Sequence, residues 1–114
     1  MENNKPTISI DDFKKLEIKI GQILSVEKVL DADKLLKLSV DVGETNPRQI
    51  ISGISEFFPD PQILVGKKCA FATNLESRVI RGFESQGMIL AVNGDSFFSL
   101  LETSTDVVPG SIVK

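Results

Sequence analysis

The sequence predicts an all-β fold, a small barrel of five strands followed by a surplus hairpin near the C-terminus. Three observations favour this class. Apolar and polar residues alternate in several short runs, turn signals separate these runs, and no apolar run is longer than about five residues. With 114 residues and a hydrophobic content of 41%, the chain has enough material for one packed domain.

The ordered part of the chain is expected to begin near residue 10, after a flexible polar tail at residues 1–9. Ser9 directly before a short apolar-periodic run is typical of a helix N-cap, so about one turn of helix should precede the first strand. From Leu16 to Glu27 apolar and polar residues alternate, which predicts a long half-buried strand. Gly21 within this run predicts the bend or bulge that a closing barrel needs.

The middle of the chain supplies three more strands. Residues 36–42 show the cleanest alternation, with the apolar side chains on one face. After a loop at residues 43–47 come strands at residues 48–54 and 68–73, with a short helical turn between them at residues 62–66. The strand at residues 68–73 is apolar at nearly every position, which is typical of a strand buried on both faces.

The C-terminal part predicts a hairpin. The apolar runs 88–92 and 97–101 flank Asn93-Gly94, and an Asn-Gly pair between apolar runs is the strongest short hairpin signal. The number and length of the earlier strands fit a five-stranded barrel of the oligonucleotide/oligosaccharide-binding (OB) type. This last hairpin is therefore an extension beyond the barrel.

Composition excludes several classes of function. With 13 Lys and Arg against 16 Asp and Glu, the net charge is −3, which argues against a generally basic nucleic-acid binder but allows a small basic patch. The chain has no histidine and a single cysteine, Cys69, so His-based catalysis, His/Cys metal sites and internal disulfides are not expected. The sequence predicts no enzyme, no cofactor and no membrane segment, a core thiol at Cys69 and a cytoplasmic location.

Residues 74–88 hold the candidate binding residues. Arg78 and Arg81 are three residues apart with Gly82 after them, and guanidinium forks suit phosphate oxygens, while exposed Asn and Ser suit sugar hydroxyls or base edges. On an unbroken strand the odd spacing would point the two arginines to opposite faces, so a shared ligand requires a twist or turn between them. The alternative on residue types alone is a strand with solvated arginines, a turn and a buried strand.

A set of short pieces in a fixed order carries a resemblance to a known family. The pieces are Asp12-Phe13, Asp31-Ala32-Asp33-Lys34-Leu35, Gln49-Ile50-Ile51-Ser52-Gly53-Ile54, Gly66-Lys67-Lys68, Asn74-Leu75, Arg81-Gly82 and Ser85-Gln86-Gly87-Met88-Ile89-Leu90-Ala91. Together they run from about residue 10 to the end of the chain. The chain resembles the tRNA-binding domain that occurs free-standing in bacteria and archaea, and as the C-terminal part or separate β chain of methionyl-tRNA synthetase.

The resemblance implies an OB barrel over residues 10–114 whose C-terminal extension helps to build a homodimer. It also implies structure-specific tRNA binding by shape, through phosphate, 2′-hydroxyl and backbone contacts, in the service of methionyl-tRNA synthetase. Carried over onto matching positions, the RNA-binding residues would be Lys34, Asn74, Arg78, Arg81, Ser85 and Met88, with Ser52 and Gly53 close by.

The chain departs from the family pattern beside the arginines. Family members usually carry a lysine and a proline after Asn-Leu and another basic residue before Arg-Gly, where this chain has Glu76, Ser77 and Val79. Fewer cations predict weaker tRNA binding with a shallower salt dependence. The reduced patch favours an alternative, a CsaA-like export chaperone that binds unfolded polypeptide, whereas the Asp-Lys-Leu, Ser-Gly-Ile and Gly-Met-Ile-Leu pieces follow the tRNA-binding branch.

Overall fold

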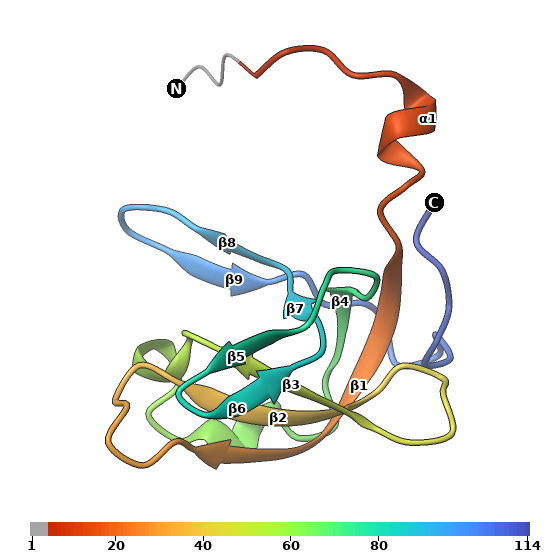
Figure 1. Ribbon diagram of the computed structural model, residues 1–114. Coiled ribbons are helices and arrows are strands. Elements are labelled where there is room, and N and C mark those ends of the chain that lie inside the picture. Colours follow the sequence, from red (N-terminus) through yellow and green to blue (C-terminus); the bar gives the residue numbers. More distant parts are fainter. Residues whose placement is uncertain (1–4) are drawn as a thin grey trace.

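A five-stranded antiparallel sheet in the order β3-β2-β1-β4-β7 curls into a nearly closed barrel (Figure 1). This computed structural model describes residues 5–114, so residues 1–4 of the expected N-terminal tail lie outside the described part. The elements are α1 (Ile10–Phe13), β1 (Ile18–Lys28), β2 (Leu36–Asp41), β3 (Arg48–Ser52), η1 (Ser55–Phe57), η2 (Pro61–Leu64), β4 (Lys68–Ala72), β5 (Arg78–Ile80), β6 (Phe83–Ser85), β7 (Met88–Ile89), β8 (Ala91–Asn93) and β9 (Phe98–Leu100). The prediction of an all-β barrel of five strands is confirmed.

The predicted single turn of helix is present as α1. The hydroxyl of Ser9 accepts a hydrogen bond from the backbone N–H of Asp12 at 3.0 Å, which satisfies one of the free donors of the first turn. Across residues 5–114, the structure has no helix of the length and apolar character that crossing a membrane requires.

Strand β1 is long enough to pair with both β4 and β2. Its first half pairs with β4 and its second half with β2, and the pairing with β2 shifts register between Ile23 and Ser25. Leu24 is the extra residue: it is 44% exposed, whereas Ile23 is fully buried. The bulge predicted at Gly21 therefore lies at Leu24, because the extra residue falls where β1 changes partner, and Gly21 pairs regularly with Cys69.

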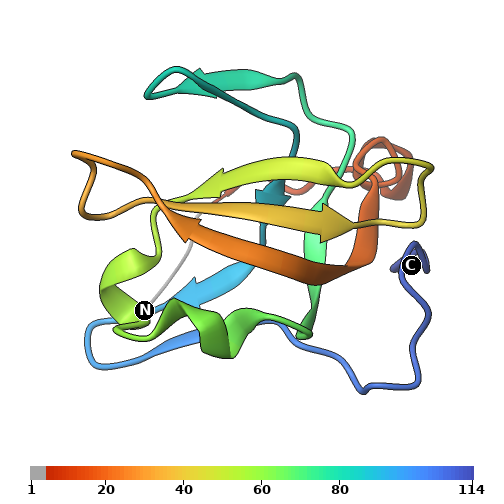
Figure 2. The same ribbon diagram turned by 90° about the horizontal axis from the view of Figure 1, so that it is seen from below.

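The core fills the barrel from several strands. Leu36, Leu38 and Val40 on β2 are fully buried, as the alternation predicted, and they pack with Phe71 of β4. Leu64 of η2 is also fully buried, and Figure 2 shows η1 and η2 together at the end of the barrel away from α1. The one helical turn expected near this place is thus accompanied by a second one at η1, for which the sequence pattern gave no signal.

Hydrogen bonds from Ser85 and Gln86, which lie just before β7, join this part of the chain to β3. The backbone N–H of Ile51 donates to the Ser85 hydroxyl at 3.0 Å, and the backbone N–H of Gln49 donates to the Gln86 side-chain oxygen at 3.0 Å. The Gln86 N–H in turn donates to the Gln49 carbonyl at 2.8 Å. These bonds replace a regular ladder, and they seat the β5–β6 hairpin over β3 (Figure 1).

The apolar run 88–92 is divided between two sheets. Met88–Ile89 forms β7 and pairs with β4, whereas Ala91–Asn93 forms β8 and pairs with β9 in a hairpin that projects from the barrel (Figure 1). Isolated bridges from Glu102 to Cys69 and from Ile112 to Lys19 then bring the C-terminal segment back to the barrel. The predicted hairpin is present, and its first strand begins after the barrel strand has ended.

Cys69 is a buried thiol, and we expect it to resist alkylation in the folded protein. Burial, with a smaller contribution from the Glu102 carboxylate, raises the pKa of the thiol from 9.0 to about 11. The folded state therefore holds this proton more tightly than the unfolded state, and the stability that it contributes is lost as the pH rises from about 9 to about 11. Iodoacetamide at pH 8 should label Cys69 far more slowly without urea than in urea; equal rates would contradict its burial.

Candidate nucleic-acid interface

In the β5–β6 hairpin, Arg78 begins β5 and Arg81 lies in the tight turn that follows it. Ile80 pairs with Phe83, which leaves the two-residue turn Arg81-Gly82 with φ angles of +53° and +84°. Positive φ at both positions is the mark of a type I′ turn, which favours Asn, Asp or Gly. Arg81 therefore holds a left-handed backbone that costs on the order of 1–2 kcal/mol in a residue with a Cβ atom. The strand that carries Arg78 therefore ends at Ile80, directly before Arg81.

Arg81 faces the loop between β1 and β2. It lines a shallow hollow together with Lys34 and the neighbouring Asp31 and Asp33. Lys34 and Arg81 are exposed, and within residues 5–114 neither makes an ion pair, although the two carboxylates lie in the same hollow. Two cations are thus brought together from parts of the chain that are far apart in sequence.

Arg78 and Met88 share a second hollow. Leu75 and Glu76 complete its rim, and Ile80 lines both this hollow and the one around Arg81, so the two are neighbours. The Met88 side chain is 49% exposed although it begins a barrel strand. The arginine is also exposed and has no ion pair in the described part of the chain. We call these two adjoining hollows the arginine face.

Asn74 and Ser85 use their polar groups inside the chain. The Asn74 side chain accepts from the N–H of Glu17 at 2.7 Å and donates to the carbonyl of Lys15 at 2.6 Å, which ties the loop after β4 to the segment between α1 and β1. Ser85 is only 5% exposed; it accepts from Ile51 and donates to the Gly87 carbonyl at 3.2 Å. Ser85 lines the hollow around Arg78, whereas Asn74 precedes Leu75 of its rim, and direct contact with RNA stays a prediction for both.

Ser52 and Gly53 lie beside Lys34. Ser52 ends β3 and pairs with Leu36, and the N–H of Ser55 donates to the Lys34 carbonyl at 3.1 Å. A Cβ atom added to Gly53 would lie 3.9 Å from that same carbonyl. The two residues therefore lie next to Lys34 of the arginine face, and their contact with RNA stays a prediction.

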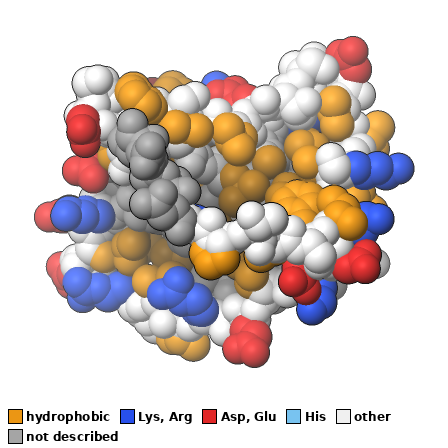
Figure 3. All heavy atoms as spheres, turned by 90° about the horizontal axis from the view of Figure 1, so that it is seen from above, with side chains coloured by type: hydrophobic (Ala, Val, Ile, Leu, Met, Phe, Trp, Pro, Cys, Tyr) orange, Lys and Arg blue, Asp and Glu red, His pale blue; other side chains and the backbone are white. Residues whose placement is uncertain are grey.

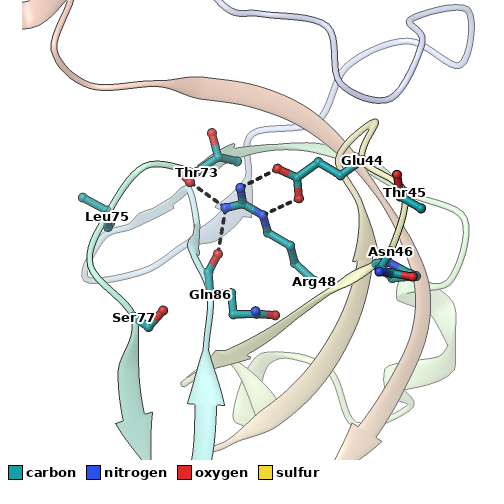
Figure 4. Close-up of a pocket in the computed structure, with 9 residues that line it drawn as sticks. Glu44, Thr45, Asn46, Arg48, Thr73, Leu75, Ser77 and Gln86 are labelled. Carbon is teal, nitrogen blue, oxygen red and sulfur yellow. Dashed lines mark hydrogen bonds and ion pairs between the residues drawn. The ribbon is translucent and has the colours of Figure 1, made fainter.

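The structure adds Arg48, a residue that the sequence presented only as the start of a strand. Its Nε and Nη2 donate to the Glu44 carboxylate at 2.8 and 2.7 Å, and its Nη1 donates to the carbonyls of Thr73 at 2.5 Å and Gln86 at 3.0 Å (Figure 4). Hydrogen bonding to Arg48 holds the pKa of the Glu44 carboxyl below its usual range, and Glu44 likewise raises the pKa of Arg48. One guanidinium thus ties together the ends of the segments that carry Asn74 and Met88.

A cation–π contact helps to seat the hairpin. The Lys37 ammonium on β2 lies 4.6 Å from the centre of the Phe83 ring on β6, and it also pairs with Glu27 at 3.3 Å. Lys37 is therefore engaged within the chain, whereas Lys34, three residues earlier, makes no ion pair in the part of the chain that the structure describes.

Comparisons with known proteins find similar sequences along nearly the whole chain. A family model described as "Putative tRNA binding domain" matches residues 18–112. The methionine–tRNA ligase of Lactiplantibacillus plantarum is 42% identical over 110 residues, which cover 96% of this chain and 16% of the ligase. This chain thus spans about a sixth of the length of that relative.

Two solved structures share the fold. The crystal structure of a MetRS-related protein from Pyrococcus horikoshii has a TM-score of 0.89 and 33% identity, with 96% of this chain and 100% of that chain covered. The chaperone CsaA from Bacillus anthracis has a TM-score of 0.83 and 22% identity, with 96% and 100% covered. At that low identity the second likeness shows a common fold alone.

Proposed function

Because this chain belongs to the tRNA-binding domain family, we propose that it binds the folded shape of tRNA without catalysing a reaction, as an accessory factor or β chain of methionyl-tRNA synthetase. The observation that carries the proposal is the arginine face, where Arg78, Arg81 and Lys34 are exposed and make no ion pair within residues 5–114. A ligand with regularly spaced anionic oxygens matches such a face better than a small molecule does.

The roles of the residues follow from their surroundings. The guanidinium groups of Arg78 and Arg81 and the Lys34 ammonium would contact phosphates, and the exposed Met88 would pack against a ribose or a base. Asn74 and Ser85 would hold the loops of the arginine face in place. Such contacts carry little base information, so the expected specificity is for the shape of tRNA rather than for its sequence.

We also propose that two copies associate through the apolar end of the molecule. Figure 3 looks onto this end, where apolar side chains gather in the centre and charged ones lie around the rim. An apolar groove there is lined by Ile10, Phe13, Leu16, Ile112 and Val113. Sedimentation equilibrium would detect the dimer, which could place two arginine faces on one tRNA and so offset the reduced basic patch. A monomer at micromolar concentration would contradict it.

Replacing Arg81 by asparagine tests the proposed function. Asparagine tolerates the positive φ of the turn, so Arg81→Asn removes the charge and keeps the hairpin. Loss of one charge-assisted phosphate contact should weaken tRNA binding by roughly 1–3 kcal/mol, and the salt slope should fall by about 0.7–0.9. Fluorescence anisotropy with labelled bulk tRNA at several salt concentrations measures both quantities.

Lys67→Gln is the matched control. Lys67 lines neither hollow of the arginine face, so Lys67→Gln removes one positive charge away from that face; it also gives up an exposed ion pair with Glu102 at 3.1 Å, which contributes little to stability. Unchanged affinity in Arg81→Asn, or an equal loss in both variants, would show that the arginine face is not the binding surface. An unfolded polypeptide that displaces tRNA at equal concentration would instead favour the chaperone alternative.

A further inference from the structure

One side of the Arg48 guanidinium is anchored to the backbone, and the other side presents two N–H donors. Its Nη1 is held by two backbone carbonyls, those of Thr73 and Gln86, so the position of the group does not depend on Glu44. The edge formed by Nε and Nη2 points the other way, toward the Glu44 carboxylate (Figure 4). Such a fork binds carboxylate and phosphate with the same paired geometry.

Glu44 reaches the fork from a loop at the surface. Its side chain is 39% exposed and that of Arg48 is 20% exposed, and the loop begins at Gly43 with a φ of +82°. Rotation of the Glu44 side chain into water is enough to vacate the fork, because the backbone carbonyls keep the guanidinium in position. The hydrogen bonds from Arg48 hold the pKa of the Glu44 carboxyl below its usual range, so the group in the fork is a charged carboxylate at neutral pH.

The fork opens into a polar groove that adjoins the arginine face. Thr45, Asn46, Leu75 and Ser77 line this groove with Arg48 and Glu44. Leu75 also lines the hollow that holds Arg78, so the groove and the hollow meet at this side chain. A nucleic-acid backbone that crosses Arg78 can therefore continue into the groove, where hydroxyl and amide groups surround the fork.

We propose that Arg48 is a further phosphate-binding residue for the RNA backbone, and that Glu44 occupies its fork until RNA takes the place of the carboxylate. This inference rests on the proposed function. In the absence of RNA the carboxylate satisfies Nε and Nη2, as a partly buried guanidinium requires. Glu44 then acts as an internal competitor, and removal of its charge strengthens RNA binding.

Glu44→Gln and Glu76→Gln form a matched pair that tests the exchange. Each removes one carboxylate beside the same binding surface, but Glu44 alone contacts Arg48. Loss of a nearby negative charge should tighten tRNA binding about twofold in Glu76→Gln, whereas release of the fork should tighten it about fivefold or more in Glu44→Gln. In an Arg48→Lys background, which keeps the charge and loses the fork, the extra gain from Glu44→Gln should disappear.

A spectroscopic measurement on the unaltered protein keeps the inference testable if the Arg48 variant folds poorly. With ¹⁵N-labelled arginine, the Arg48 Nε–H resonance should move when bulk tRNA is added to the wild-type protein. In Glu44→Gln, millimolar inorganic phosphate alone should move the same resonance. Two results would overturn the exchange. One is an equal gain in tRNA affinity from Glu44→Gln and Glu76→Gln. The other is an Arg48 Nε–H resonance that does not move when tRNA binds, whether or not free phosphate moves it.

The two proposals fail in different ways. If the wild-type protein does not bind tRNA, the proposed function fails. If tRNA binds and Arg81→Asn weakens it, but Glu44→Gln behaves like Glu76→Gln, the arginine face stands and the role of Arg48 as a phosphate ligand is wrong.

Discussion

Replacing Gly21 by alanine is expected to lower the free energy of unfolding by roughly 2–3 kcal/mol, since overpacking a core costs this much. An added Cβ atom would lie 2.7 Å from Val40 Cγ1 and 2.8 Å from Phe71 Cδ1. Both neighbours are fully buried, so neither can turn away without disturbing the barrel. The lower backbone entropy of alanine in the unfolded chain, about 0.5–1 kcal/mol, offsets only part of this cost.

Gly53→Ala is the control for Gly21→Ala. Its new Cβ atom would meet nothing closer than the Lys34 carbonyl at 3.9 Å, so the entropic gain is unopposed and the free energy of unfolding should rise by about 0.5–1 kcal/mol. Urea unfolding followed by circular dichroism measures both variants. Similar losses in the two would show that crowding at Gly21 is not the cause.

Arg48→Met is the second large effect, with an expected loss of about 3 kcal/mol. The carbonyls of Thr73 and Gln86 would lose a charged donor, and a hydrogen bond to a charged group contributes about 1.5–3 kcal/mol. Methionine retains most of the apolar stem, so packing changes little. Loss of the contact with Glu44 adds less, because that carboxylate can return to water.

Arg78→Met separates this structural role from the loss of charge. Arg78 is exposed, and within residues 5–114 its side chain makes no hydrogen bond or ion pair. Its replacement should therefore change the free energy of unfolding by less than about 0.5 kcal/mol. Thermal unfolding of the two variants side by side gives the comparison. An Arg48→Met variant as stable as Arg78→Met would mean that the two carbonyls find other donors.

The parts of the fold that the sequence predicts are those decided by local alternation. Strand β2 has one buried and one half-buried face, and its apolar residues repeat every second position. The bulge in β1 was placed wrongly because Gly21 and Leu24 both fit an interruption of the pattern, and the choice depends on where β1 changes partner. The run 88–92 gave no sign of its division at Leu90, since all five residues are apolar.

The candidate site shows the same limit. The spacing of Arg78 and Arg81 required a turn between them, but arginine is unusual in a type I′ turn, so its position was not evident. The contacts of Arg48 reach carbonyls 25 and 38 residues away, and the Ser85 hydroxyl meets a backbone N–H 34 residues away. Pairings over such distances leave no periodicity in the sequence.

The tether between the start of β1 and the loop after β4 has a mechanical consequence. Besides the two bonds of Asn74, the Thr73 N–H donates to the Glu17 carbonyl at 2.9 Å and its hydroxyl donates to the Glu17 carboxylate at 2.7 Å. A pulling force on the N-terminal end of the chain therefore acts on these hydrogen bonds before it acts on the pairing between β1 and β4. Tension at that end would release the segment leading to Arg78 first, so the proposed binding surface would loosen while the barrel stayed intact.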